Sequence, residues 1–388
     1  MDMNITKIRN IVWVTAASVL LLGAKGAPSA ADFPFRLYQR LSNGRPGHNL
    51  IYSPHSVSQA FFMADLGARG QTQSQIERNI DLKSSIAPPS TGENAPALWI
   101  ANRIWLARDI KVDQSYLESS QKQGGATPGY VDFADRPAEA ANTINSWVQT
   151  QTHGKIRSLI PAGALNARTR LILTNAVYFK GPWENPFKKE LTSNAHFTLS
   201  SGATLSVPFM HEHERMDFIQ DSLAQVIKLP YLGREFAMVI VLPKKGVSPS
   251  KVSAALSAKR LESWEGKMNF ADVELALPRF KFDSDFVLNS ELQSLGVRLP
   301  FDPGHADFSG IDGKKDLYVA KVFHKAFISV DEAGTEAAAA TAIEMRMKAV
   351  IHVEKPIVMN VDHPFVFMIQ DLRSKAILFI GRVANPKE

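Results

Sequence analysis

Two serines and a histidine stand close together at Ser53, His55 and Ser56. Serine and histidine can act as nucleophile and general base, but the histidine then needs a third group that orients it. Neighbours at the start of one helix cannot align in this way. The chain also contains no G-x-S-x-G, H-E-x-x-H or Walker motif. The sequence therefore predicts no catalytic residues, and we expect that the protein is not an enzyme.

A possible metal clip lies at His211 and His213, which a β-strand would place on one face. Imidazoles bind zinc and related metals, but a stable site needs further ligands, and the local spacing supplies none. Asp283 and Asp285 likewise lack the rest of a calcium-binding loop. A solvated polar strand is the favoured interpretation of the histidine pair. We expect no metal site and no cofactor.

The segment from Glu332 to Thr341 supports two contradictory structures. Its alanines and glutamates are strong helix formers, which favours an exposed amphipathic helix. With a period of two, small residues fall on one face, as in a strand that packs against a core. A segment with both options is a candidate conformational switch, which we call the hinge. The hinge residues are Glu332, Gly334, Thr335, Glu336, Ala337, Ala338, Ala339, Ala340 and Thr341.

The composition is that of a globular protein that can bury a large core. The 388 residues are 45% apolar and 21% charged, with a net charge of +6. No dense run of lysine and arginine marks a nucleic-acid interface, so we expect no nucleic-acid partner. Cysteine is absent, which excludes disulfides and thiol chemistry.

Residues 1–31 have the pattern of a signal peptide. Lys7 and Arg9 precede an apolar run from Ile11 to Gly23, and small residues follow up to Ala31. The run is short for a membrane span, so cleavage after Ala27 or Ala31 is favoured over an uncleaved anchor. We expect export from a bacterial cell into the periplasm or the medium, with no membrane attachment after cleavage.

The elements that position these residues change in character along the chain. Helices are predicted early, at 32–41, 53–66, from 72, and at 137–152; Ser53 serves as N-cap with Pro54 at the first helical position. Strands are predicted mainly later, at 98–106, 170–179, 224–229, 237–242, 273–282, 326–330, 365–370 and 376–382. No linker divides the chain, so the pattern indicates one α+β domain.

Short segments spread over the chain resemble the serpins, the superfamily of serine protease inhibitors. They are Asn49–Ser56, Leu66–Gly70, Thr174–Trp183, Leu229–Tyr231, Leu242–Pro243, Leu277–Phe280, Ala306–Gly310, Val322–Ala326, the hinge, Asp362–Phe365 and Gly381–Pro386. They occur in the family's order and cover nearly everything after residue 31. The resemblance implies a serpin domain at 32–388. It further implies three β-sheets, about eight helices and an exposed reactive loop at about 332–361.

The resemblance also implies two supporting clusters around the point where a central sheet can part. The shutter would contain Ser53, Ser56, Asn175 and His324, whose polar groups can exchange hydrogen-bond partners when strands move. The breach would contain Trp183, Arg279 and Glu332 at the top of that sheet.

The family's spacing from Glu332 places the reactive bond between Lys348 and Ala349, with Arg346 and Met347 as alternative bait residues. A lysine bait suits a trypsin-like protease, because its specificity pocket ends in an aspartate. The implied function is covalent inhibition of a serine protease by a monomer, through insertion of the cleaved loop into a sheet.

The alternative is a non-inhibitory serpin that binds a partner or is cleaved as a substrate. Two departures from the family bear on the details. The short stretch 83–97 replaces an additional helix and makes polyanion activation doubtful, and the run 349–361 is longer than expected.

Overall fold

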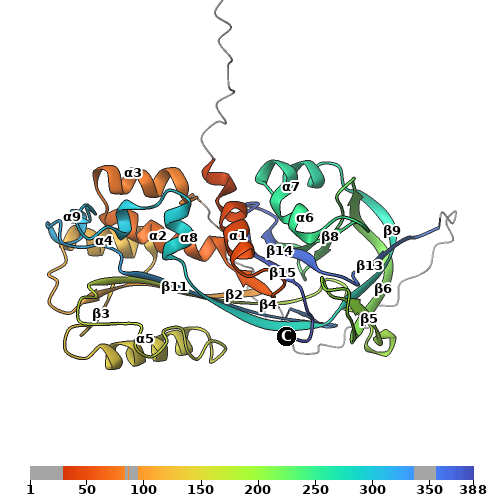
Figure 1. Cartoon of the computed structure of the whole chain (residues 1–388), viewed down its shortest axis with the longest axis horizontal. Coiled ribbons are helices and arrows are strands. Elements are labelled where there is room, and N and C mark those ends of the chain that lie inside the picture. Colours follow the sequence, from red (N-terminus) through yellow and green to blue (C-terminus); the bar gives the residue numbers. More distant parts are fainter. Residues whose placement is uncertain (1–28, 84–85, 87–94, 336–354) are drawn as a thin grey trace, which may run out of the picture.

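The computed structural model describes residues 29–83, 86, 95–335 and 355–388, which form two β-sheets with helices around them (Figure 1). The first sheet has six strands in the order β10-β11-β12-β4-β2-β3. Its strands are β2 (Ala97–Ala107), β3 (Gly129–Val131), β4 (Leu171–Pro182), β10 (Phe280–Val287), β11 (Lys321–Asp331) and β12 (Gly334–Thr335). Nearly every residue of β4 is buried, as expected for a central strand that is covered on both faces.

The second sheet has nine strands and consists of two parts. One part has the strand order β1-β15-β14-β8-β7, and the other has the order β6-β9-β13, with β5 paired to β6. The two parts are joined by only four residue pairs between β6 and β7. Its strands are β1 (Leu50–Tyr52), β5 (Ser193–Thr198), β6 (Thr204–Gln220), β7 (Ala224–Pro230), β8 (Phe236–Pro243), β9 (Asn269–Pro278), β13 (Ile357–Asn360), β14 (Phe365–Asp371) and β15 (Ile377–Val383). With these two parts counted separately, the described residues form the three expected sheets.

Nine α-helices lie within the described residues, close to the expected number. They are α1 (Phe33–Gly44), α2 (Pro54–Gly67), α3 (Gly70–Asn79), α4 (Gln114–Gly124), α5 (Pro137–Gln151), α6 (Pro249–Ala255), α7 (Ala258–Glu265), α8 (Asn289–Ser294) and α9 (Ser309–Asp312). Short 3-10 turns occur at Ala30–Asp32, Lys189–Leu191 and Leu299–Phe301. In Figure 1, α5 lies below the six-stranded sheet and most other helices lie above it.

Local chemistry explains where α2 begins. Ser53 has an extended backbone, and its hydroxyl accepts a hydrogen bond from the backbone N–H of Ser56, while Pro54 occupies the first helical position. The predicted N-cap is therefore confirmed. The N-cap also fixes Ser53 and Ser56 next to the six-stranded sheet, where α2 packs against β2 and β4.

One predicted strand is wrong. The stretch 273–282 was predicted as continuous, but β9 ends at Pro278 and β10 begins at Phe280 in the other sheet. Between them, the backbone N–H of Arg279 donates to Pro208 O at 3.0 Å, which ties the crossing to β6. The apolar alternation changes phase at this point, from Val273, Leu275 and Leu277 to Phe280 and Phe282 after Pro278. This phase change was a local signal of the break, and the prediction of one continuous strand overlooked it.

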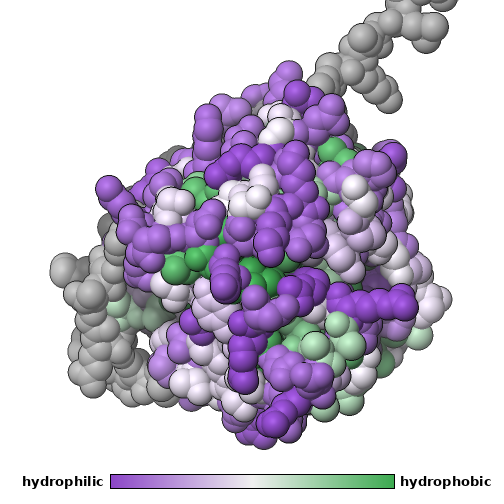
Figure 2. Space-filling view, turned by 90° about the vertical axis from the view of Figure 1, so that its left-hand side faces the viewer, coloured by the Kyte–Doolittle hydropathy of each residue, from purple (hydrophilic) through white to green (hydrophobic). Residues whose placement is uncertain are grey.

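Figure 2 shows the end of the molecule that lies at the left of Figure 1. Polar residues dominate this surface, and apolar residues show only in small areas between them. Among the helices of the described residues, none combines the length and the apolar character that crossing a membrane requires. The apolar run 11–23 lies outside the described residues.

Candidate functional site

The parallel pair β4–β11 at the centre of the six-stranded sheet is open at one end. The two strands pair directly from Ile172 with Lys321 to Tyr178 with Phe327. Beyond this point β12 lies between them: Thr335 pairs with Gly181 on one side and with Val330 on the other. The line between β4 and β11, which we call the seam, is thus closed by direct pairing at its lower end and occupied by the first hinge residues at its upper end.

Gly334 and Thr335 are held tightly in the upper seam. Gly334 has a φ of 149°, and a Cβ there would lie 2.2 Å from Gly181 O, so only glycine fits. Thr335 is 1% exposed, and its hydroxyl is 2.6 Å from the Tyr231 hydroxyl. The predicted loop of 332–361 is therefore too wide: Glu332–Thr335 belongs to a β11–β12 hairpin, and residues 357–360 form β13. Backbone pairing with β4 and β9 explains both corrections.

Aromatic rings pack against the β11–β12 turn, where the hinge begins. The Trp183 ring stacks on Tyr231 with 4.7 Å between centroids and an angle of 11°. The indole N–H of Trp183 donates to Asp331 O at 3.0 Å, and its backbone N–H donates to Ala333 O at 3.0 Å. Trp183 therefore binds the β11–β12 turn through its backbone and side chain together, as the predicted breach requires.

Glu332 is the charged anchor of this turn. Its carboxylate accepts hydrogen bonds from the Arg279 guanidinium, with Nε at 2.7 Å, and from the Thr192 hydroxyl. The Glu332 side chain is only 3% exposed, whereas that of Arg279 is 41% exposed. Burial raises the pKa of Glu332, but the hydrogen bonds from Arg279 and Thr192 outweigh burial, so the pKa lies below its ordinary value. The carboxylate is therefore ionised at neutral pH.

The lower seam is held by neutral polar groups. The backbone N–H of Ser53 donates to His324 Nε2 at 3.1 Å. The Ser56 hydroxyl donates to Asn102 Oδ1 at 2.6 Å, and Asn102 Nδ2 donates back to Ser56 O at 3.0 Å. Asn175 lies opposite Asn102 on one side and opposite His324 on the other, so the predicted shutter residues do come together.

His324 is buried in its neutral form. Because Nε2 accepts a hydrogen bond, the proton of the neutral ring lies on Nδ1. Full burial lowers the pKa of His324 to about 3. Neither His324 Nδ1 nor Asn175 Oδ1 has a hydrogen-bond partner among the residues that the structure describes. A buried donor and a buried acceptor on adjacent strands are an unusual combination, since nearly all such groups are paired in folded proteins.

Sequence reasoning missed Asn102, Thr192 and Tyr231. Asn102 lies in a predicted strand, where it and Arg103 interrupt an apolar run, and this interruption was a usable signal. Tyr231 lies in one of the segments that resemble the serpins, Leu229–Tyr231, but its sequence context gives no indication of its contact with Thr335. Thr192 follows a short turn, and nothing local to it indicates that its hydroxyl reaches Glu332.

Several predicted site residues lie outside the described part of the chain. They are the hinge residues Glu336, Ala337, Ala338, Ala339, Ala340 and Thr341, and the reactive bond Lys348–Ala349. The alternative baits Arg346 and Met347 also lie there. Their placement remains a prediction from the sequence.

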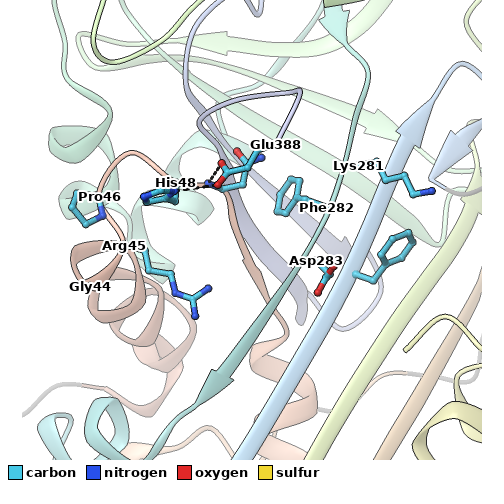
Figure 3. Close-up of a pocket in the computed structure, with 10 residues that line it drawn as sticks. Gly44, Arg45, Pro46, His48, Lys281, Phe282, Asp283 and Glu388 are labelled. Atoms are coloured by element: carbon cyan, nitrogen blue, oxygen red, sulfur yellow. Dashed lines mark hydrogen bonds and ion pairs between the residues drawn. The ribbon is translucent and has the colours of Figure 1, made fainter. Parts of the chain in front are cut away.

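The other candidate chemistry does not converge on a site. His213 pairs with Asp272 at 3.1 Å and His211 lies 3.4 Å from Ser193, and the described residues contain no group of three potential metal ligands. An open cavity of about 800 Å³ borders the outer edge of β10 (Figure 3). In this cavity His48 Nδ1 lies 3.1 Å from Glu388 Oε1, so the two side chains already bind each other.

Comparisons with known proteins agree with this geometry. A family profile described as serpin (serine protease inhibitor) matches residues 28–386. Leukocyte elastase inhibitor A of Mus musculus is 37% identical over 372 residues, covering 91% of this chain and 97% of that protein. A serpin-like protein of Thermococcus kodakarensis is also 37% identical, covering 92% and 85%.

The solved structures give the same answer for the fold. The native state of the thermophilic serpin tengpin superposes with a TM-score of 0.82 at 27% identity, covering 92% of this chain and 93% of the other. A family profile that spans almost the whole chain, and relatives that align nearly end to end, leave one conclusion. The chain belongs to the serpin family of serine protease inhibitors.

Proposed function

We propose that the protein inhibits its target protease covalently by inserting its own cleaved loop between β4 and β11. The protease serine attacks the carbonyl of the bait residue, the peptide bond breaks, and the new amine leaves while the acyl-enzyme remains. The freed hinge then extends β12 down the seam. The tethered protease is pulled along, and distortion of its oxyanion hole prevents water from completing the reaction.

The observation that carries this proposal is the position of Thr335. It already pairs with both β4 and β11, so the inserted strand has its first residues in place before cleavage. Because Thr335 faces the core, Ala337, Ala339 and Thr341 share that face in a continued strand. These side chains are small enough to enter a seam that opens only briefly, and none carries a charge that must be desolvated.

The energy for insertion comes from the sheet itself. About a dozen new backbone hydrogen bonds at ~1 kcal/mol each amount to roughly 10 kcal/mol. The uncleaved protein is then kept in its active form by a kinetic barrier, not by a lower free energy.

Two target classes are supported by different observations. Lys348 at the family's bait position favours a trypsin-like protease, whose pocket carries an aspartate. The similarity to proteins named leukocyte elastase inhibitor favours an elastase-like protease, whose pocket is small and would accept Ala349 in place of lysine.

The test incubates the protein separately with trypsin and with elastase. An SDS-stable band heavier than either partner is expected with one of them, and mass spectrometry of the released C-terminal peptide identifies the cleaved bond. A peptide that begins at Ala349 supports Lys348 as bait, and Lys348→Ala should then slow the association with trypsin far more than Arg346→Ala. Complete cleavage without a covalent band, with both proteases still active, would contradict the proposal and support the non-inhibitory alternative.

We also propose that the protein acts outside the cell as a monomer. The leader pattern in residues 1–31 supports export, and the described fold is anchored immediately after it, where Asp32 Oδ1 accepts the backbone N–H of Ala258 at 2.9 Å. Expression in a bacterium, followed by cell fractionation and N-terminal sequencing, tests this. Mature protein that begins near Asp32 outside the cytoplasm is expected, and an intact N-terminus in the cytoplasm would contradict export.

A further inference from the structure

A row of aromatic rings crosses the six-stranded sheet on the face that α5 covers. Trp99 of β2, Tyr178 of β4 and Phe327 of β11 are neighbours in register. The Trp99 and Tyr178 rings are stacked with 5.0 Å between centroids, and the Tyr178 and Phe327 rings are 6.1 Å apart at 49°. We call these three residues the aromatic row.

The row lies where the seam must open next. Tyr178 and Phe327 form the last direct pair between β4 and β11, and β12 occupies the seam three residues further up, at Gly181 and Val330. An entering strand separates its neighbours by one further strand spacing, about 4.8 Å. That movement breaks the Tyr178–Phe327 contact completely, whereas the Trp99–Tyr178 contact lies on one side of the seam and can move as a unit.

Cationic and aromatic neighbours hold the row from both sides. Lys155 Nζ lies over the Tyr178 ring at 5.7 Å, and Lys281 Nζ lies over the Phe327 ring at 5.9 Å. His153 meets the edge of Trp99 at 5.3 Å. His153 and Lys155 belong to the turn after α5, while Lys281 belongs to β10, so each half of the row is fixed to a different element.

The neighbouring pair of the seam on the same face offers less resistance to separation of β4 and β11. One step down the seam, Ala176 pairs with Lys325, whose ammonium is bound to Asp283 at 3.0 Å on its own side of the seam. Among the described residues, Tyr178–Phe327 is the one aromatic contact that joins β4 to β11. Phe327 also lines the cavity of about 800 Å³ beside β10.

We propose that the Tyr178–Phe327 contact sets the rate at which a strand enters the seam. The inference rests on the proposed function, since it concerns the insertion step. It assigns the resistance to separation of β4 and β11 to two positioning residues, Tyr178 and Phe327, which lie in the sheet and outside the reactive bond. A weaker contact speeds insertion and also allows the uncleaved protein to lose its active form sooner. The row thus balances fast trapping of a protease against lifetime of the active inhibitor.

The test measures strand entry without any protease. A synthetic peptide with the sequence of residues 334–347 is added to the uncleaved full chain, and its incorporation is followed by native mass spectrometry. Phe327→Val should raise the incorporation rate about tenfold, which corresponds to about 1.4 kcal/mol in the barrier. Tyr178→Leu is the second variant and should act in the same direction, with folding of each variant verified by circular dichroism.

Two controls separate the contact at the seam from general weakening. Trp99→Val removes a ring of the row that does not span the seam, and should change the rate by at most about twofold. Phe270→Val removes a ring that is 54% exposed in the other sheet, and should leave the rate unchanged.

Equal rates for Phe327→Val and wild type would overturn the proposal, as would failure of every variant to take up peptide. If Phe327→Val accelerates peptide uptake tenfold but the wild type forms no covalent protease complex, the proposal for the Tyr178–Phe327 contact stands and the proposed inhibition is refuted. If Phe327→Val does not accelerate uptake but the wild type traps its protease, the proposed inhibition stands and the proposal for the Tyr178–Phe327 contact is refuted.

Discussion

The upper and lower parts of the seam are held by different chemistry. The upper part combines a buried carboxylate, a half-exposed guanidinium and stacked rings; its residues are Trp183, Tyr231, Arg279, Glu332 and Thr335. The lower part contains only neutral groups; its residues are Ser53, Ser56, Asn102, Asn175 and His324. The first hinge residues have entered the upper part, whereas direct strand pairing still closes the lower part.

This difference shows how a sheet can be prepared for insertion and still stay closed. At the top, charge-assisted bonds bind the β11–β12 turn and fix the register of the first inserted residues. At the bottom, hydroxyl, amide and imidazole groups can change partners as strands separate, and Asn175 Oδ1 and His324 Nδ1 have none among the described residues. We therefore expect substitutions at the two ends to differ in size, in pH dependence and in functional consequence.

The largest effect should come from a charge in the upper seam. Thr335→Arg places a guanidinium where the native side chain is 1% exposed, at a desolvation cost of several kcal/mol. The hinge should then leave the seam, and the protein should be cleaved by its target without trapping it. Gel analysis of complex against cleaved product measures this. Thr335→Ser keeps the hydroxyl near Tyr231 and serves as control; equal trapping by Thr335→Arg and wild type would contradict insertion through this hinge.

The next largest effect is the pH dependence of the lower seam. The folded protein keeps His324 neutral because burial lowers its pKa to about 3, whereas an unfolded histidine takes up a proton below about 6.5. The unfolded state thus binds more protons between these values, and the free energy of unfolding should fall as the pH falls from 6.5 toward 3, by up to about 5 kcal/mol.

Urea unfolding at several pH values measures this dependence. His324→Gln lacks the titrating group, so its free energy of unfolding should decline less over the same range, and the difference from wild type isolates this histidine. Parallel pH profiles for the two proteins would show that His324 does not account for the acid sensitivity.

A third prediction concerns asymmetry within the upper seam. Arg279→Met leaves the Glu332 carboxylate buried without its cation and should cost about 3 kcal/mol. Glu332→Gln leaves the half-exposed guanidinium accessible to water and should cost only about 1 kcal/mol. Thermal unfolding of both variants at neutral pH compares them directly. If the two variants lose equal stability, or if Glu332→Gln loses more, the burial of Glu332 does not determine the stability that the Arg279–Glu332 pair contributes.

The smallest effect is expected at Asn102. Asn102→Ala removes the reciprocal hydrogen bonds with Ser56 and should lower the free energy of unfolding by about 1 kcal/mol. Gln59→Ala removes only a long contact of 3.4 Å to the same amide and is the matched control with a smaller loss. If Asn102→Ala unfolds like wild type, Asn102 does not belong to the lower seam.

Much of the fold was accessible to sequence reasoning because local chemistry determines it. The N-cap at Ser53, the proline at the first position of α2 and the buried run of β4 each depend on neighbours within a few residues. The family resemblance added long-range order, and the breach and shutter residues it indicated do lie together at the two ends of the seam.

The amino-acid sequence by itself determined which residues the hinge contains and that its small side chains can form a strand, since alternation is a local property. Only the tertiary structure decided that Thr335 is already buried between β4 and β11, that the strand predicted at 273–282 divides between two sheets, and that Tyr178 and Phe327 close the seam below it. The physical reason is that strand pairing joins residues far apart in the chain. Register, burial and partner choice then depend on contacts that no short window of sequence contains.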